Sequence, residues 1–188
     1  MKMSEIEKAV AGLLYNANND LEILKMRKDA KIKLFEINNL HPNKEQERQN
    51  LFRELLGKVG ENFTFDGYFH CDYGFNIELG ENFYANVNLV ILDGAKVKIG
   101  NNVFIAPNVG IYTAGHPLDK ETRNQGLEYA LPITIENNVW IGAGVSIMPG
   151  VTIGEGAVIG AGSVVTRSIP PNVVAVGNPC KVLKSIIE

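Results

Sequence analysis

The stretch from Ile135 to Pro170 divides into six units of six residues: IENNVW, IGAGVS, IMPGVT, IGEGAV, IGAGSV and VTRSIP. An aliphatic residue opens each unit, and a small or aliphatic residue recurs at its fifth position. An α-helix repeats about every 3.6 residues and a half-buried strand about every two, so neither explains this period. The pattern is typical of a parallel β-solenoid, in which each unit is a short strand plus a turn. We therefore expect triangular coils of three units, with the opening aliphatic residues inside and Gly and Asn making the turns.

The register of these units extends toward the N-terminus. Phrases of the same form begin at Leu79, Ile99, Ile135 and Ile153. The last two gaps are 36 and 18 residues, which are whole multiples of one coil, whereas the first gap is 20 residues. The longer gap predicts a two-residue insertion near Asp93-Gly94. Residues 112–131 contain no clean unit, so we expect them to form a loop that protrudes from the prism.

Composition narrows the class of protein. The chain has 188 residues, 45% of them hydrophobic, which is enough to bury a core. Its formal net charge of -3 gives no reason to expect a nucleic-acid partner. No apolar run suits a signal peptide or a membrane span. The two cysteines, Cys71 and Cys180, form no CxxC motif. We expect reduced thiols and a cytoplasmic protein.

The residues before the repeats predict a helical module. We expect helices over residues 4–14 and 20–38, the second capped by Asp20, and a third that begins with an Asn43–Gln46 capping box and ends at Gly57. Residues 1–58 then form a module that packs on the first coils, and residues 59–188 form the β-helix with a C-terminal tail at 170–188. The expected apolar positions are Ile6, Val10, Leu13, Leu14, Leu21, Leu24, Leu34, Ile37, Leu51, Phe52, Leu55 and Leu56. Alternating aromatic residues between Phe63 and Phe75 predict the opening strands.

His116 is the first candidate for chemistry. It lies in the protruding loop between Gly115 and Pro117, a poor environment for a core side chain. A neutral imidazole can accept the proton of an alcohol, because histidine titrates near neutral pH. Glu128, in the returning arm of the same loop, is the candidate acceptor for the other ring N–H. The alternatives are a histidine that only stabilises the loop and an ordinary solvated glutamate.

Other candidates lie on the repeats. Trp140 precedes the inward-facing Ile141, so it should point away from the core and contact either a ligand or another subunit. Asn86 and Asp93 lie on the preceding coils, where an asparagine ladder and an Asx turn are the structural alternatives. Basic residues gather at the C-terminal end and could hold phosphates: Arg167, Lys181 and Lys184.

Several motifs together resemble one family. They are Tyr15-x-Ala-Asn-x-Asp20, Asn82-Phe-Tyr-Ala-Asn86, Gly115-His-Pro-Leu-Asp119, Asn138-Val-Trp-Ile-Gly142, Gly160-Ala-Gly-Ser-Val-Val-Thr166 and Gly177-Asn-Pro-Cys180. In this order the chain resembles the maltose/galactoside O-acetyltransferases of the hexapeptide-repeat acyltransferases. The resemblance implies a left-handed parallel β-helix, acetyl-CoA as co-substrate, no metal, and a homotrimer with active sites between subunits.

The same resemblance implies roles for individual residues. His116 matches the general base, and Asp20, Asn86 and Asp93 match contacts to the acceptor sugar. Asp72 stands where a relative has serine, so the acceptor pocket is expected to differ there. Trp140 matches the residue beside the pantetheine arm, and the coenzyme A site would be lined by Ala143, Ala161, Thr166, Arg167, Lys181 and Lys184.

These observations favour an enzyme that moves an acetyl group from acetyl-CoA to a hydroxyl of a sugar. Three alternatives remain: an acetyltransferase with a non-sugar acceptor, an acyltransferase that uses a carrier protein, and a non-catalytic binding protein. A zinc-dependent solenoid enzyme is disfavoured because the chain has only three histidines, His41, His70 and His116, without the close pair that such a site needs.

Overall fold

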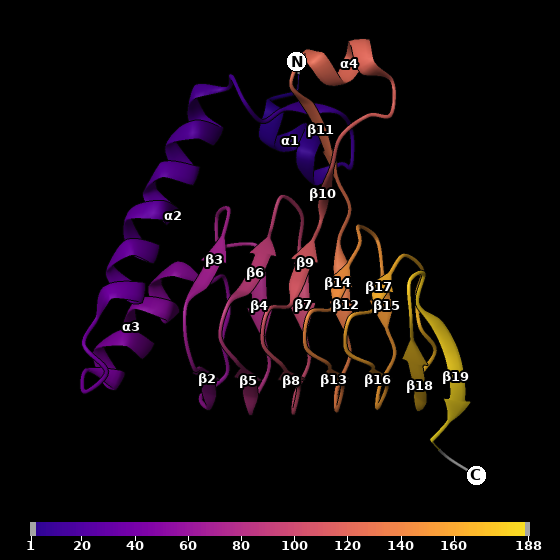
Figure 1. Cartoon of the computed structure of the whole chain (residues 1–188). Coiled ribbons are helices and arrows are strands. Elements are labelled where there is room, and N and C mark those ends of the chain that lie inside the picture. The colour runs from indigo at the N-terminus through magenta and orange to yellow at the C-terminus, as the bar shows by residue number, and fades with distance from the viewer. Residues whose placement is uncertain (1–2, 187–188) are drawn as a thin grey trace.

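A parallel β-solenoid forms most of the molecule. The structure, a computed structural model, describes residues 3–186. Successive coils stack along one axis and build a three-sided prism (Figure 1). The four-stranded sheet contains β15 (Thr152–Ile153), β12 (Ile133–Ile135), β7 (Val97–Ile99) and β4 (Ile77–Leu79). The five-stranded sheet contains β17 (Val164–Val165), β14 (Ser146–Ile147), β9 (Gly110–Tyr112), β6 (Leu89–Leu92) and β3 (Phe69–Cys71). The seven-stranded sheet contains β19 (Lys181–Ser185), β18 (Val173–Val176), β16 (Val158–Ile159), β13 (Trp140–Ile141), β8 (Phe104–Ile105), β5 (Phe83–Ala85) and β2 (Phe63–Phe65).

The interior follows the six-residue pattern. The opening residues of the units are at most 1% exposed, which confirms the predicted stack: Ile135, Ile141, Ile147, Ile153, Ile159 and Val165. Positive φ angles recur every six residues at the fourth position of the first five units: Asn138, Gly144, Gly150, Gly156 and Gly162. Glycine and asparagine tolerate this left-handed conformation better than other residues, so they set where each strand ends.

The strand register confirms the predicted insertion. Leu79 pairs with Ile99, 20 residues later. Phe63 pairs with Phe83, also 20 residues later, so the preceding coil carries the same excess. Both long turns connect the five-stranded sheet to the four-stranded sheet. We call this edge of the prism the loop corner; it comprises residues 72–76, 93–96, 113–132, 148–151 and 166–168. The edge from the seven-stranded to the five-stranded sheet is the Asn86 corner, comprising residues 66–68, 86–88, 106–109, 142–145 and 160–163.

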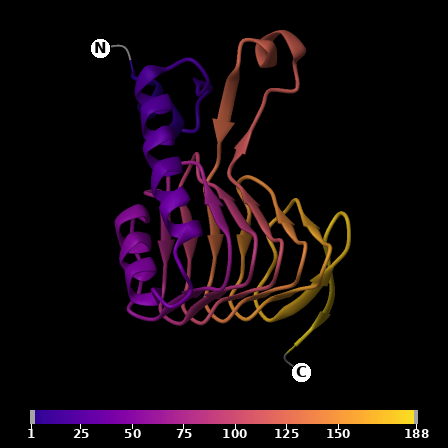
Figure 2. The same cartoon turned by 60° about the vertical axis from the view of Figure 1, so that its left-hand side comes forward.

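The predicted protruding loop leaves the prism at the loop corner. It contains β10 (Ala114–Gly115), α4 (Lys120–Asn124) and β11 (Leu127–Ala130). β11 pairs with β10 and, on its other side, with β1 (Tyr15–Asn16). Figure 2 shows the loop rising beside the N-terminal helices. The N-terminal segment is thus paired, as a β-strand, with the loop that carries His116.

The N-terminal helices cover the first coils. They are α1 (Glu5–Val10), α2 (Leu21–Asn39) and α3 (Glu45–Leu55). Buried residues of α2 and α3, including Leu34, Ile37 and Phe52, belong to the same hydrophobic cluster as the solenoid interior. The expected packing of this module on the first coils is therefore confirmed. No helix within residues 3–186 has the length and apolarity needed to cross a bilayer.

Some details of the helical module were predicted wrongly. The first helix ends at Val10 because Gly12 adopts a φ of 69°, so Leu13 and Leu14 lie outside it and are exposed. Val10 is 84% exposed. The Asn43–Gln46 capping box does not form: Lys44 occupies the N-cap position, and the Asn43 side chain contacts His41 instead.

The second helix has a different buried face from the one expected. Asp20 caps it as predicted, accepting from the backbone N–H groups of Glu22 and Ile23. Leu21 and Leu24 are exposed, because the face that meets the solenoid carries a different set of residues. That face consists of Ile23, Ala30, Leu34 and Ile37.

Candidate active site

His116 follows β10 in the protruding loop, and its side chain is half exposed. Its Nδ1 lies 3.1 Å from the carbonyl oxygen of Leu127 on the returning strand. A carbonyl oxygen can only accept, so in this contact Nδ1 carries the hydrogen. In the neutral ring Nε2 is then the nitrogen that carries the lone pair. This tautomer suits a base that accepts a proton from a bound alcohol.

Glu128 lies on the other side of the imidazole from the position expected. The prediction gave Glu128 the second ring N–H, but the Leu127 carbonyl takes that position. Glu128 Oε1 is instead 3.9 Å from Nε2, too long for a hydrogen bond. The carboxylate is mostly buried and lies beside Nε2.

Tyr15 is a residue of this cluster that sequence reasoning missed. It lies opposite Glu128 in the β1–β11 pair, and its hydroxyl donates to Glu128 Oε2 at 3.3 Å. Burial, and then the charge of Glu128, raise the pKa of the Tyr15 phenol, so it remains a donor. The motif around Tyr15 marked the segment, but only the long-range strand pairing reveals its partner.

Asp93 lies at the loop corner with no exposed surface. Its carboxylate accepts from the backbone N–H groups of Asp72 at 3.0 Å, Tyr73 at 2.9 Å and Gly74 at 2.7 Å. Burial raises the pKa of Asp93 to about 6, although the N–H groups of Tyr73 and Gly74 oppose that rise. In this chain the carboxylate therefore holds the turn of the preceding coil in shape.

That turn contacts a second residue that the sequence did not single out. Arg27 of α2 donates from Nη2 to the Tyr73 hydroxyl at 3.2 Å, and its Nε lies 3.9 Å from Asp72 Oδ1. The Nε atom is buried without a hydrogen-bond partner among the described residues. Burial raises the pKa of Asp72, and the charge of Arg27 opposes this. Arg27 and Asp72 are thus a pair of opposite charges close to Tyr15 and Glu128.

Asn86 lies at the Asn86 corner, a different edge of the prism from the loop corner that contains Asp93. Its Nδ2 donates to the Tyr84 hydroxyl at 3.1 Å, and its Oδ1 accepts from the backbone N–H of Val87 at 2.8 Å. Ala143 and Ala161 lie exposed on later coils of the same corner. In a single chain Asn86 therefore lies at a different corner from Asp72 and Asp93, while Asp20 lies at the start of α2.

Trp140 points out of the prism and is 56% exposed, as predicted. Strand register places it in one outward row of the seven-stranded sheet with Phe104, Val158, Val174 and Lys184. Paired residues of neighbouring strands point to the same face of a sheet, so Trp140 and Lys184 share a surface. Lys181 lies on the same strand as Lys184, whereas Thr166 and Arg167 lie exposed at the loop corner.

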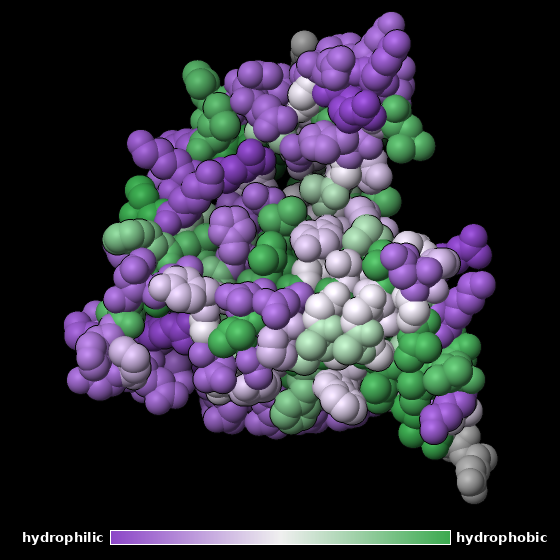
Figure 3. Space-filling view, in the orientation of Figure 1, coloured by the Kyte–Doolittle hydropathy of each residue, from purple (hydrophilic) through white to green (hydrophobic). Residues whose placement is uncertain are grey.

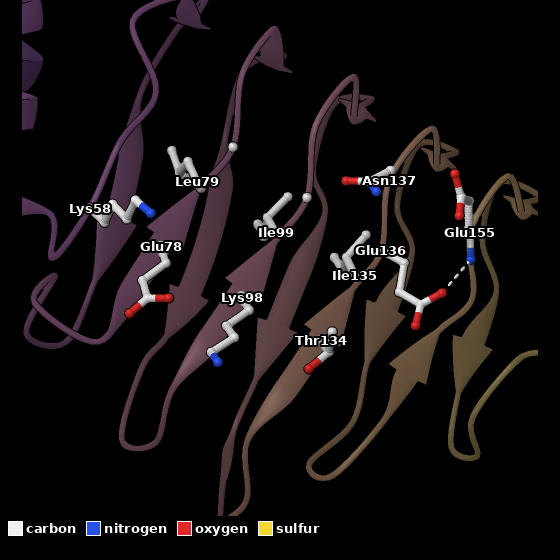
Figure 4. Close-up of a pocket in the computed structure, with 12 residues that line it drawn as sticks. Lys58, Glu78, Leu79, Lys98, Ile99, Thr134, Ile135, Glu136, Asn137 and Glu155 are labelled. Atoms are coloured by element: carbon white, nitrogen blue, oxygen red, sulfur yellow. Dashed lines mark hydrogen bonds between the residues drawn. The ribbon is translucent and has the colours of Figure 1, made fainter.

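An open hollow of about 490 Å3 lies on the outer face of the four-stranded sheet (Figure 4). Lys58, Glu78, Lys98 and Glu136 line it, and none of the predicted site residues does. Glu78 pairs with Lys96 at 2.6 Å, so part of the charge around the hollow is already neutralised. Among residues 3–186 no group of three or more His, Cys, Asp and Glu side chains is arranged to hold a metal ion.

Comparison with known proteins places this architecture. Residues 8–60 match the maltose acetyltransferase hexapeptide capping motif, and residues 132–167 match the bacterial transferase hexapeptide (six repeats). A Saccharomyces cerevisiae protein that bears an acetyltransferase name is 63% identical over 186 residues, covering 99% of this chain and 95% of its own.

Two solved structures agree closely with the fold. A maltose O-acetyltransferase from Clostridium difficile 630 has a TM-score of 0.97 at 50% identity, covering 99% of both chains. A galactoside acetyltransferase in complex with coenzyme A has a TM-score of 0.95 at 47% identity, covering 98% of this chain and 92% of its own.

The solenoid, its capping helices and the histidine loop define a hexapeptide-repeat acetyltransferase. Within that class, the chain belongs to the maltose/galactoside O-acetyltransferase family. It is an acetyl-CoA-dependent acetyltransferase, as the coenzyme A complex of its 47%-identical relative supports.

Proposed function

We propose that this chain transfers the acetyl group of acetyl-CoA to a hydroxyl of a sugar, by direct attack within a ternary complex. The relatives named for maltose and galactoside acetylation support the choice of acceptor. The observation that carries the mechanism is the orientation of His116, whose Nδ1 meets the Leu127 carbonyl and whose Nε2 is left to accept a proton.

In this mechanism the sugar hydroxyl attacks the thioester carbonyl while its proton passes to His116 Nε2. An alcohol is a weak nucleophile at neutral pH, so removal of the proton as the C–O bond forms lowers the barrier. The C–S bond then breaks, and the imidazolium returns its proton to the departing thiolate of coenzyme A. Glu128 stabilises the imidazolium, and Tyr15 holds Glu128 in place.

The division of the site between two corners supports a homotrimer with active sites between subunits. The loop corner of one chain would face the Asn86 corner of its neighbour. Exposed apolar residues also favour association: Phe104 is 54% and Leu183 64% exposed. Figure 3 shows apolar surface at the C-terminal end of the prism, over β18 and β19. Closed assemblies bury such surface.

Sedimentation equilibrium should therefore give a mass three times that of the chain. The apolar surface and the divided site both require a neighbour, and a ring of three supplies one to every chain. A clean monomer mass at micromolar concentration would contradict both the trimer and the shared site.

Trp140 and Lys184 form the proposed contact with coenzyme A. The indole would lie along the apolar pantetheine arm, with Lys184 further along the same outward row as a charge for the phosphates. Ala143 and Ala161, which have small exposed side chains, would leave room for the arm.

Trp140→Ala is expected to raise the KM for acetyl-CoA by about five- to tenfold, because the arm loses an aromatic contact. The KM for the sugar should stay within about twofold, and Trp140→Phe, which keeps a ring, should lie close to wild type. Steady-state kinetics with each substrate varied in turn separate the two effects. An unchanged KM for acetyl-CoA in Trp140→Ala would place the residue in subunit packing instead.

A panel of glucosides, galactosides, maltose and amino sugars, assayed by release of the coenzyme A thiol, tests the proposed acceptor. Turnover with none of them would contradict the proposed function and favour a non-sugar acceptor.

A cytoplasmic setting is also part of the proposal, supported by two buried free thiols, Cys71 and Cys180. Burial raises the pKa of both, which keeps them unreactive.

A further inference from the structure

A cavity of about 380 Å3 opens where α2, α3 and the first coil meet. Its size falls within the range of roughly 300–1,000 Å3 that is usual for small-molecule sites. It lies at the N-terminal end of the Asn86 corner and outside the cluster around His116. The side chains that shape it are Asn38, Glu45, Arg48, Thr64, Asp66 and Tyr68.

A chain of hydrogen bonds connects this cavity to Asn86. The Tyr84 hydroxyl donates to Asp66 Oδ2 at 3.2 Å and accepts from Asn86 Nδ2 at 3.1 Å. The two successive turns of this corner are also joined through the backbone, because the N–H of Asn88 donates to the carbonyl of Tyr68 at 3.0 Å. Asp66 and Tyr68 therefore lie one coil, or about 4.8 Å along the prism axis, beyond Asn86.

The order of residues along the Asn86 corner shows on which side of Asn86 the cavity lies. Ala143 and Ala161, the candidate contacts of coenzyme A, lie on the C-terminal side of Asn86. Asp66 and Tyr68 lie on its N-terminal side. If the reacting hydroxyl is held at Asn86 with the thioester on one side, the rest of the acceptor extends toward the cavity.

The chemistry of the cavity suits a neutral, hydroxyl-rich ring. Tyr68 is 62% exposed and offers an aromatic face for the apolar side of a sugar. The carboxylates of Asp66 and Glu45 are exposed and accept hydrogen bonds from hydroxyls, but they repel anions. The Arg48 guanidinium already donates to the carbonyls of Phe65 and Gly67. A phosphate or carboxylate would thus meet two acidic groups and an occupied cation.

We propose that this cavity is a second sugar subsite, which holds the neighbouring ring of a neutral disaccharide while the first ring is acetylated at Asn86. This inference rests on the proposed function and adds a substrate class to it. Tyr68 supplies the stacking surface and Asp66 the hydrogen-bond acceptor. The enzyme should therefore prefer a disaccharide to the corresponding monosaccharide.

The test compares acceptors in matched pairs, maltose with glucose and lactose with galactose, at saturating acetyl-CoA. In at least one pair the wild-type kcat/KM should be about tenfold higher for the disaccharide. Tyr68→Ala should lower that value by about tenfold and leave the monosaccharide within about twofold, whereas Tyr68→Phe keeps the ring and the preference. Phe35→Ala removes an exposed aromatic residue that does not line the cavity, so it should leave the preference unchanged.

The outcomes separate this inference from the proposed function. Equal kcat/KM values within both wild-type pairs, or equal losses for both acceptors in Tyr68→Ala, would overturn the subsite while sugar acetylation stands. Absence of turnover with all four sugars would overturn the proposed function and the subsite with it. Unchanged circular dichroism and acetyl-CoA affinity in Tyr68→Ala would assign its loss to the acceptor.

Discussion

His116→Ala is expected to lower kcat by about two to four orders of magnitude, the usual contribution of acid–base catalysis. The substitution removes Nε2, the atom that would accept the hydroxyl proton. The ring makes one backbone contact, to Leu127, and is half exposed, so its loss should change the free energy of unfolding by only about 1 kcal/mol. Single-turnover and steady-state assays with acetyl-CoA measure the effect directly.

Glu128→Gln provides the matched comparison. It keeps the shape of the side chain and an oxygen for the Tyr15 hydroxyl, but it removes the charge 3.9 Å from Nε2. We expect an intermediate loss of about tenfold in kcat. Near-normal turnover in His116→Ala would end the proposed mechanism.

The amount of structure that the sequence predicts depends on how local the cause is. The six-residue period is a local property. Each opening aliphatic residue, such as Ile141 or Ile153, stacks on the equivalent residue of the neighbouring coil. Inward and outward directions follow from the same register, so the exposure of Trp140 was predictable. The two-residue insertion was equally readable, since it displaces every later phrase.

The helical module was harder to predict because its faces are decided by what they pack against. Leu21 and Leu24 are as hydrophobic as the buried Ile23, and only the rotation of α2 on the first coil selects among them. Leu13 became exposed because the helix ends before it, at a glycine whose φ is positive.

The contacts of the active site were partly hidden for a similar reason. Tyr15 and Glu128 are 113 residues apart in sequence and meet through an antiparallel pair between the N-terminal segment and the loop. Arg27 reaches Tyr73 from a helix to a corner of the solenoid. No period or motif predicts such pairs. His116 could be singled out because a histidine between glycine and proline is unusual within the repeats.

Asp93→Ala is expected to be the most destabilising of the substitutions considered, lowering the free energy of unfolding by about 3–5 kcal/mol at pH 7. Three backbone N–H groups, those of Asp72, Tyr73 and Gly74, would lose their shared acceptor, two of them in fully buried contacts. Asp119→Ala is the control, because that carboxylate also accepts a backbone N–H but on the exposed helix α4. Because that side chain is exposed, its loss should lower the free energy of unfolding by much less than the loss of Asp93. Equal losses in urea unfolding at one protein concentration would contradict the role given to burial.

The same carboxylate should also make stability depend on pH. Burial raises the pKa of Asp93 from its ordinary value of about 3.9 to about 6. Between these two values the folded chain holds a proton that the unfolded chain has lost, so stability falls as pH rises through this window. A shift of about two units corresponds to about 3 kcal/mol. Asp93→Asn cannot ionise, so its stability relative to wild type should improve by about that amount from pH 4 to pH 7. Parallel stability curves for the two proteins over this range would show that the carboxyl titrates near its ordinary pKa.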